Sequence, residues 1–419
     1  MQVSLEKLTQ AMQKVKKFAD DNKNVPGVML DINENSMKVC YSDGKRAIVE
    51  KLDILQGQEP IQGKIVVPYK RLMEIIESCQ PSGILATSDF DIEFGSDNIM
   101  TISYAKKIKL APKKGEVQEG EEPEYEEKTV SRFSQKITYA KPEDNIKYGV
   151  LSRMDYDSIF DGENPDIWDK SELKDILSRL STEKNKIIYI SRNMKKAFVC
   201  NLAHVTDIPI TSCENHTVVI HTSVASALVD MLNKMPGDTV SIVVKDQRYA
   251  NIRSENNEVG IWFELSPASR TDIVTLERYQ QKDYSKYRII VLREALTNVI
   301  NCAMSVDNNE KTNLIIGNDD ENNLVIKIAN ANAGQSVANE FAVVVEKCVD
   351  ADGKLKELQI PVSLKVLHDM LTNCKNYYAA LDISIDEQGM YLRVEDLKQD
   401  DETGNIVAET THYTISARA

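Results

Sequence analysis

The sequence predicts an α+β fold made of three repeats of one module, each with two helices and antiparallel sheets. A strand-to-helix pattern occurs three times, a second amphipathic helix precedes each copy, and short alternating strands follow the helices. A length of 419 residues allows about two to four domains. With 42% apolar residues, each of them can bury a core.

The repeated pattern is a short apolar strand, then a proline or threonine, then an amphipathic helix. Its copies read KIVVPYKRLMEIIESCQPSG from Lys64, TVVIHTSVASALVDMLNKMPGD from Thr217 and LQIPVSLKVLHDMLTNCKNY from Leu358. We expect Pro68, Thr222 and Pro361 to start the helices. A proline in the first turn lacks only an N–H that would have no partner there, and a threonine can cap the helix.

The preceding helices are expected over 5–18, 170–180 and 292–304. Short strands follow each one, such as VMLDI, KIIYISR and NLIIGN. Turn-forming residues separate strands at 33–35, 43–44 and 319–322. The alternation of acidic and apolar residues over 89–93 indicates a half-buried strand with an acidic outer face.

Two segments interrupt this order. Seven glutamates and no base occur from Glu116 to Glu127, which predicts a solvated loop or insertion. The stretch after Leu265 has little periodicity and is expected to connect two modules. The predicted division is therefore module 1 at 1–112, an acidic insertion and linker at 113–164, module 2 at 165–270, a connector at 271–286 and module 3 at 287–419.

The distribution of charge matters more than its sum. A formal net charge of −14 argues against nucleic acid, because binding duplex DNA depends on neutralising phosphates with Lys and Arg. The six expected helices, however, carry +5 together, which leaves −19 for the other residues. Such a split suits a ring whose helices line a positive channel while its strands form an acidic outer wall.

The first helix has the best cluster of bases. Its apolar stripe leaves Lys7, Lys14, Lys16 and Lys17 outside the core. The weaker candidates for facing DNA are Lys174, Arg179 and Lys365. The alternative for each base is an ordinary solvated helix face.

With the triple repeat established, the sequence resembles the bacterial-type DNA sliding clamp, the β subunit of DNA polymerase III. The resemblance is carried by HTVVIHTSVASALVDMLN from His216, by Leu202 and Ile208-Pro209-Ile210 ahead of it, by LQIPVSLKVLHDML and by the final HYTISARA. The chain has AFVCNL at 197–202 where the family usually has Thr-Asp-Gly-His-Arg-Leu, and it lacks the family's usual ending. These departures indicate a divergent member, such as a phage-encoded clamp.

The resemblance implies a closed ring formed by a head-to-tail homodimer. Such a ring encircles duplex DNA without sequence preference, is placed there by a clamp loader and tethers the replicative polymerase. It also implies a docking pocket for partner peptides between the second and third modules, formed by Leu202, Pro267, Thr414, Ile415 and Ser416. The alternative is an interaction scaffold or decoy that keeps the clamp fold and recruits polymerase partners without encircling DNA.

No motif in the sequence points to catalysis. Phosphate-binding, dinucleotide-binding, zinc-protease and serine-nucleophile motifs are missing, and the five histidines do not occur at metal-ligand spacing. We therefore expect a protein that is not an enzyme, with no catalytic residues, cofactor or metal. The seven cysteines form no CxxC pair and are expected to be buried thiols. No long apolar run occurs, so a cytoplasmic protein with no membrane partner is expected.

Overall fold

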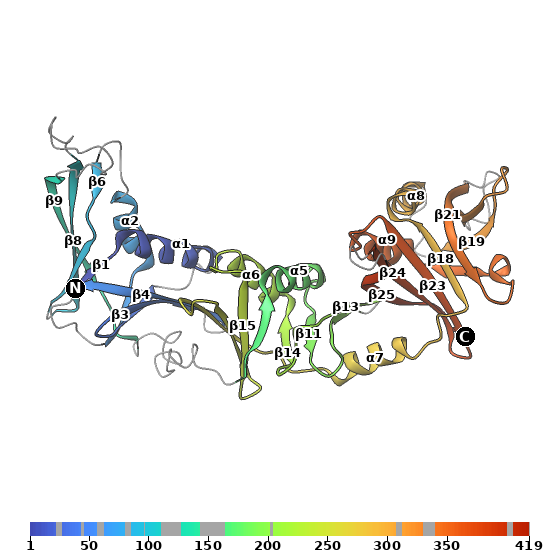
Figure 1. The fold of residues 1–419 in the computed structure, drawn as a ribbon, viewed down its shortest axis with the longest axis horizontal. Helices are drawn as coiled ribbons and strands as arrows, with labels where there is room; N and C mark the ends of the chain where they lie inside the picture. Colours follow the sequence, from blue (N-terminus) through green and yellow to red (C-terminus); the bar gives the residue numbers. More distant parts are fainter. Residues whose placement is uncertain are drawn as a thin grey trace, which may run out of the picture. The chain divides into compact units, whose positions relative to one another are not determined.

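The computed structural model describes residues 1–21, 27–42, 46–56, 63–79, 85–95, 97–109, 127–142, 164–201, 204–306, 312–329, 340–399 and 405–418 (Figure 1). The helices are α1 (Leu5–Asp21), α2 (Tyr69–Ser78), α5 (Lys170–Leu180), α6 (Thr222–Leu232), α7 (Arg270–Gln280), α8 (Arg293–Val306), α9 (Leu364–Thr372) and the short 3-10 helix η3 (Leu355–Glu357). In this part of the chain, no helix is both long enough and apolar enough to cross a membrane.

The strands up to α6 are β1 (Gln2–Val3), β2 (Val28–Ile32), β3 (Ser36–Ser42), β4 (Arg46–Gln56), β5 (Gly63–Val67), β6 (Leu85–Thr87), β7 (Phe90–Phe94), β8 (Ile99–Lys109), β9 (Glu127–Thr138), β10 (Asp166–Asp169), β11 (Ile187–Ser191), β12 (Lys196–Cys200), β13 (His204–Pro209) and β14 (Val218–His221). The later strands are β15 (Thr239–Lys245), β16 (Tyr249–Ser254), β17 (Val259–Glu264), β18 (Tyr287–Leu292), β19 (Thr312–Asn318), β20 (Leu324–Ala329), β21 (Glu340–Asp350), β22 (Gln359–Val362), β23 (Tyr378–Asp386), β24 (Gly389–Gln399) and β25 (Ile406–Arg418).

The chain divides into two compact units, which are described separately. Unit 1 comprises Met1–Lys170 and Asp230–Glu264, and unit 2 comprises Ser171–Val229 and Leu265–Ala419. In unit 1 the antiparallel strands follow the order β10-β15-β16-β17-β4-β1-β7-β8-β6, with β2, β3 and β5 joined through β4, and β9 paired along β8. In unit 2 the order is β14-β11-β12-β13-β25-β24-β23-β18-β21-β20-β19-β22.

One order of elements recurs along the described chain: a strand, a helix, four strands, a helix and three strands. It runs from β10 to β17 around α5 and α6, and from β18 to β25 around α8 and α9. The order from β1 to β9 around α1 and α2 is the same except for the additional short strand β6. If β6 is set aside, the first strand of each set pairs with the first strand after the second helix, as in β1 with β7, β10 with β15 and β18 with β23.

The first helix of each set forms because apolar residues recur three and four positions apart. Each stripe includes three side chains that are at most 1% exposed, namely Leu8, Met12 and Val15 on α1, Leu173, Leu177 and Leu180 on α5, and Leu296, Ile300 and Ala303 on α8. Aligning these three stripes places Lys14, Arg179 and Cys302 at one equivalent helical position. All three stripes fall on the helices that the sequence predicts.

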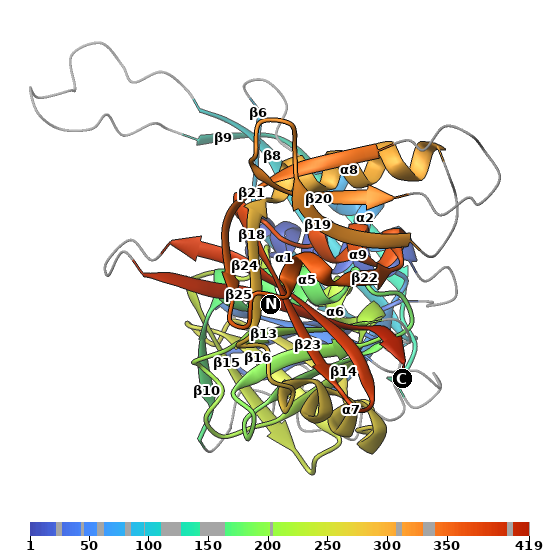
Figure 2. The same ribbon diagram turned by 90° about the vertical axis from the view of Figure 1, so that its right-hand side faces the viewer.

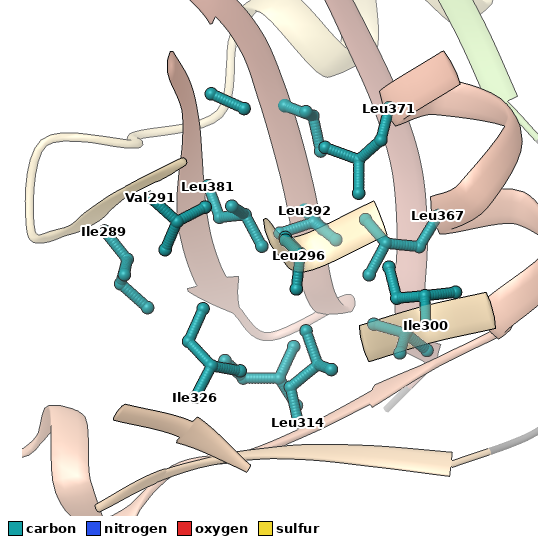
Figure 3. Packing of buried hydrophobic residues seen from close by; sticks show 14 of the residues in the cluster. Ile289, Val291, Leu296, Ile300, Leu314, Ile326, Leu367, Leu371, Leu381 and Leu392 are labelled. Atoms are coloured by element: carbon teal, nitrogen blue, oxygen red, sulfur yellow. The ribbon is translucent and has the colours of Figure 1, made fainter. Parts of the chain in front are cut away.

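The core between β18 and β25 shows how these stripes are buried (Figure 3). Leu296 and Ile300 from α8 meet Leu367 and Leu371 from α9, and both pairs lie against side chains of the strands, such as Leu381. The helices α8 and α9 lie side by side on this sheet (Figures 1 and 2). Burying an aliphatic side chain of this size stabilises a fold by about 1.5–3 kcal/mol.

Several local expectations are confirmed. Pro68 is the N-cap of α2, and Thr222 is the first residue of α6. The strand β7 has Phe90 and Ile92 buried, whereas Asp91 and Glu93 are exposed. Residues 33–35 and 319–322 form bends and turns between strands, while 43–44 lie outside the described residues.

Pro361 is a correction, because it lies inside β22 and does not start a helix. The helix α9 begins later, and the Ser363 Oγ caps it by accepting a hydrogen bond from the Val366 backbone N–H at 3.4 Å. Among the described strands β22 pairs only with β19. A proline is tolerated in such an edge strand, because the N–H that it lacks is not needed for pairing on the unpaired side of the strand.

Two elements were not expected from the sequence. The helix α7 occupies most of the segment interpreted as a connector, and it buries only Leu276 and Tyr279, which is too little to give a clear helical period. The strand β9 lies within the segment interpreted as insertion and linker and pairs with β8 over its whole length. The glutamate run ahead of it, up to residue 126, lies outside the described residues.

The cysteines are all free thiols, but they are not all buried. Cys40, Cys79, Cys213 and Cys374 are buried, as expected, and Cys200 is half-buried. The expectation is wrong for Cys302 and Cys348, which are exposed. Cys302 is the residue that aligns with Lys14 and Arg179.

Candidate nucleic-acid and peptide interfaces

Lys7 and Lys14 on α1 lie in different surroundings. The Lys7 Nζ is 3.4 Å from a carboxylate oxygen of Asp53, and its side chain is 49% exposed, so the ammonium remains accessible. The Lys14 Nζ lies 2.6 Å from the Glu50 Oε1, and only 18% of the Lys14 side chain and 7% of the Glu50 side chain are exposed. The pKa of Glu50 is raised above its ordinary value, because the effect of burial exceeds the opposing effect of Lys14. Lys14 therefore neutralises a buried carboxylate of β4, which speaks against a role in binding phosphate.

Arg179, the equivalent residue of α5, is also turned inward. It is 8% exposed. Its guanidinium lies 2.7 Å from Asp175 and 3.1 Å from Glu409, and 3.9 Å from the wholly buried Asp396. It also donates a hydrogen bond to the Thr410 Oγ1 at 2.6 Å. The charge of Arg179 is therefore used inside unit 2, which speaks against the expected contact with DNA.

For the remaining bases, contact with DNA stays a prediction. Lys365 is exposed on α9, and Lys174 is half-buried on α5. Lys16 and Lys17 belong to α1, but their side chains lie outside what the structure describes. Lys234 is a further base, which the sequence does not single out. Its Nζ donates to the Gln13 carbonyl oxygen at 3.3 Å, and the residue lines an open groove beside α1 with Gln10, Gln13 and Lys14.

The observed helix ends also change the charge argument. Within their observed bounds the same six helices carry a net charge of +1, not the +5 obtained from the expected bounds. The helix α1 continues through Asp20 and Asp21, and bases such as Lys234 and Lys375 lie just beyond helix ends. The helices as a whole are therefore close to neutral.

The residues of the predicted peptide pocket fall on several parts of unit 2. Leu202 lies outside the described residues, and Pro267 is exposed ahead of α7. Thr414, Ile415 and Ser416 are half-buried on β25. Ile415 packs against a tyrosine cluster, which we define as Tyr189, Phe198, Val205, Val219, Leu276, Tyr279, Tyr284, Tyr391 and Tyr413.

The helix α7 covers this tyrosine cluster, so the unexpected helix is part of the candidate site. The rings of Tyr279 and Tyr413 stack with centroids 5.7 Å apart, which joins α7 to β25. The Tyr189 hydroxyl donates to Asp272 of α7 at 3.0 Å and accepts from the Ser269 N–H at 2.8 Å. Burial raises the pKa of Tyr189 to about 12, so it remains a neutral donor at physiological pH.

On the opposite face of β13 and β25 the side chains are polar. The Thr206 Oγ1 and His412 Nδ1 are 2.9 Å apart across the two paired strands. The His204 Nε2 lies 3.0 Å from the Glu183 Oε1, and this contact lowers the pKa of Glu183. Because adjacent residues of a strand point to opposite faces, His412 faces α5 while Tyr413 faces α7.

Comparison with known proteins places the fold. No family model matches the sequence, and no curated protein matches it. Solved structures do match over the whole chain. The DNA polymerase III subunit beta from Pseudomonas aeruginosa matches with a TM-score of 0.66 and 15% identity, covering 100% of both chains.

Two further structures agree with the first. The DNA polymerase III beta subunit from Thermotoga maritima matches with a TM-score of 0.62 and 12% identity, covering 100% of this chain and 99% of that chain. The DNA polymerase sliding clamp from Bacillus subtilis matches with a TM-score of 0.63 and 13% identity, covering 100% of this chain and 98% of that chain. The chain therefore has the fold of these sliding clamps, and at such low identity the likeness concerns the fold alone.

Proposed function

We propose that this protein is a DNA sliding clamp, a non-catalytic ring of two chains that encircles duplex DNA and tethers a polymerase. The fold supports this proposal, and so does the element order that recurs along the chain. Three modules per chain make six in a head-to-tail dimer, a closed arrangement that leaves no module edge without a neighbour. The first module then includes β9, which pairs along β8.

The pairing between successive modules carries the proposal furthest. The third of the four strands between the two helices pairs with the last strand of the next module, in β4 with β17 and in β13 with β25. The corresponding strand of the third module is β21, and along 340–344 its only partner among the described strands is β20. The last strand of the first module is β9, whose only strand partner among the described residues is β8. Within the residues that the structure describes, each chain thus presents one free edge of each kind.

The two strands that carry the free edges are opposite in net charge, and both expose apolar side chains. The β9 strand has Lys128, Arg132 and Lys136 against Glu127, a net charge of +2, whereas β21 has three acids against Lys347, a net charge of −2. Val130 and Phe133 of β9 are 47% and 41% exposed, and Val344 of β21 is 50% exposed. An exposed apolar edge is an association site unless another strand covers it.

Cys302 supports the same interface. The equivalent residues, the half-buried Lys14 and the buried Arg179, lie beside the pairs β4–β17 and β13–β25. Cys302 is exposed on α8, which contacts β21, the strand that lacks a partner of this kind in the described residues. Pairing of β21 with a second chain would cover this position as it is covered in the other two modules.

Sedimentation of the purified chain tests the ring. We expect a dimer at micromolar concentration, with Cys302 reacting more slowly with a maleimide than in the monomer formed on dilution. Arg132→Glu and Glu340→Lys should each weaken the dimer, and the double variant should recover it, because both interfaces then carry the exchanged charges. A stable monomer or a trimer would eliminate the six-module ring.

Contact with DNA is proposed for Lys7, Lys16, Lys17, Lys174 and Lys365. The test is retention on nicked circular DNA against linearised DNA, after loader-driven assembly or after diluted protomers reassemble around the circle. We expect retention on the circle alone. Replacing Lys16 and Lys17 by alanine should weaken DNA contact and reduce its salt dependence, because each lost phosphate contact lowers the number of released counterions. Lys14 is left unchanged, since its loss would disturb the fold.

Partner docking is proposed at Leu202, Pro267, Thr414, Ile415 and Ser416. Ile415 beside the tyrosine cluster supports an apolar site for a short linear peptide of the polymerase or loader. Leu202→Asp should abolish binding of such a peptide while the dimer persists in sedimentation. A folded variant that binds the peptide with unchanged affinity would move the docking site elsewhere.

The alternative function is a clamp-fold scaffold that recruits polymerase partners without encircling DNA. One observation favours it, namely the net charge of only +1 over the six helices. The DNA experiment separates the two functions, because a scaffold would bind partner peptides but would not be retained on circular DNA.

A further inference from the structure

The buried imidazole of His412 lies where two strands from distant parts of unit 2 pair. His412 is 0% exposed on β25 and is opposite Thr206 of β13. Its Nδ1 lies 2.9 Å from the Thr206 Oγ1, whereas its Nε2 has no hydrogen-bond partner among the described residues. A neutral imidazole tolerates this arrangement with Nε2 unprotonated. An imidazolium would need an acceptor at both nitrogens.

The surrounding charges also disfavour a proton on His412. The ring of His204 on β13 lies with its centroid 6.4 Å away, and Arg179 approaches from α5. The nearby carboxylates have other partners, with Glu183 against His204, Asp396 and Glu409 against Arg179, and Asp175 shared by Arg179 and Lys375. Burial, with His204 and Arg179 adding to it, lowers the pKa of His412 to about 3.

We propose that the pairing of β13 with β25 is a pH-sensitive latch, in which the paired strands hold His412 neutral and its protonation favours their separation. Separation admits water to Nε2 and gives the imidazole an acceptor. The latch is a property of the free chain and does not depend on the proposed clamp function.

The direction of the effect follows from linkage. The separated form binds a proton with the ordinary pKa of about 6.5, whereas the paired form excludes that proton until the pH is far lower. Above pH 6.5 neither form binds the proton, so pairing is unaffected. Below pH 6.5, the equilibrium constant for separation of the strands increases as the pH falls, and the increase approaches about tenfold for each pH unit.

Amide hydrogen exchange of the whole protein, without DNA, tests the latch. The amides of 204–207 and 411–414 are followed at pH 7.5 and 5.5, after correction for the intrinsic pH dependence of exchange. We expect their protection to fall by about tenfold between these values. The pair β4–β17 is the internal control, because it contains no histidine. The protection of β4–β17 should not fall between pH 7.5 and 5.5, because the raised pKa of Glu50 on β4 can only make this pair more stable as the pH falls.

Two variants assign the effect to one residue. His412→Asn should abolish the pH dependence, whereas His204→Asn should keep it. If His412→Asn does not fold, NMR of the wild-type imidazoles decides, because the His412 signal should not shift between pH 7.5 and 5.5 in the folded protein. Constant protection in the wild type, a fall that persists in folded His412→Asn, or a His412 signal that titrates near pH 6.5 while the strands stay protected would overturn the proposal.

Discussion

The pairs β4–β17 and β13–β25 use equivalent strands but are held together by different chemistry on the face that each presents to its helix. In β4–β17 this face is apolar, with Ile48 opposite Ile261, and one ion pair from Lys14 to Glu50. In β13–β25 it is polar, with Thr206 opposite His412 and Arg179 among several carboxylates. Equivalent strand pairs can therefore respond differently to acid and to substitution.

The largest effect is expected for Arg179→Ala. The change leaves the buried Asp396 and the half-buried Glu409 without their guanidinium, and breaking a buried pair typically destabilises a protein by about 3–5 kcal/mol. Urea titration followed by hydrogen exchange in β24 and β25 measures the free energy of unfolding of this region. The control is Arg248→Ala, since the Arg248 side chain is 65% exposed and 3.6 Å from Glu264. We expect Arg248→Ala to lower the free energy of unfolding by less than about 1 kcal/mol. Equal losses in the two variants would contradict the buried network.

Lys14→Ala should have the next largest effect. We expect it to lower the free energy of unfolding by about 2–3 kcal/mol, because only one carboxylate loses its partner, whereas several do in Arg179→Ala. Hydrogen exchange in β4 and β17 reports on this region. The double variant Lys14→Met with Glu50→Leu should recover most of the loss, since replacing an ion pair by apolar side chains removes the unpaired charge. No recovery would mean that Lys14 acts through something other than Glu50.

The loss in Lys14→Ala should also depend on pH. Burial already raises the pKa of Glu50 above its ordinary value, so this carboxyl lowers stability as pH rises from its unfolded to its folded pKa. Without Lys14 the folded pKa rises further. The difference between variant and wild type should therefore be largest at neutral pH and shrink as the pH falls towards about 4.5. Urea titrations at pH 7 and pH 5 measure it, and a difference that grows on acidification would contradict the pairing.

The smallest effect is expected for Lys375→Ala. The Lys375 ammonium pairs with Asp175, and the two side chains are 52% and 38% exposed. Exposed pairs contribute less than about 1 kcal/mol and are screened by salt. Urea titration should give a small difference in the free energy of unfolding at low salt and a still smaller one at high salt. A loss as large as that of Arg179→Ala would place Lys375 inside the buried network.

The sequence predicts the helices that bury regular stripes, because that signal is local. Leu8, Met12 and Val15 mark α1 without knowledge of the strands beneath it. It does not predict the partners of Lys14 and Arg179, since Glu50 and Asp396 are distant in sequence and a base beside an apolar stripe looks solvated. Whether a charge points into solvent depends on which strands pair below the helix, and that is a tertiary property.

The candidate site was less predictable than the fold. Ile415 lies beside a cluster of aromatic rings, but the helix that covers them buries only Leu276 and Tyr279 and so gives little periodic signal. Leu202 remains a prediction, because it lies outside the described residues. The bases Lys7 and Lys365 are accessible, which is compatible with the proposed DNA contact and does not test it.

The chemistry of each strand pair limits how far the recurring sets of elements can be exchanged for one another. A chimera carrying β17 in place of β25 would bring Ile261 opposite Thr206 and leave Arg179 without Thr410 and Glu409. The complementary exchange would place a histidine among isoleucines. Shuffling, truncation or circular permutation of this chain would therefore have to carry both strands of a pair, together with the helix that faces them.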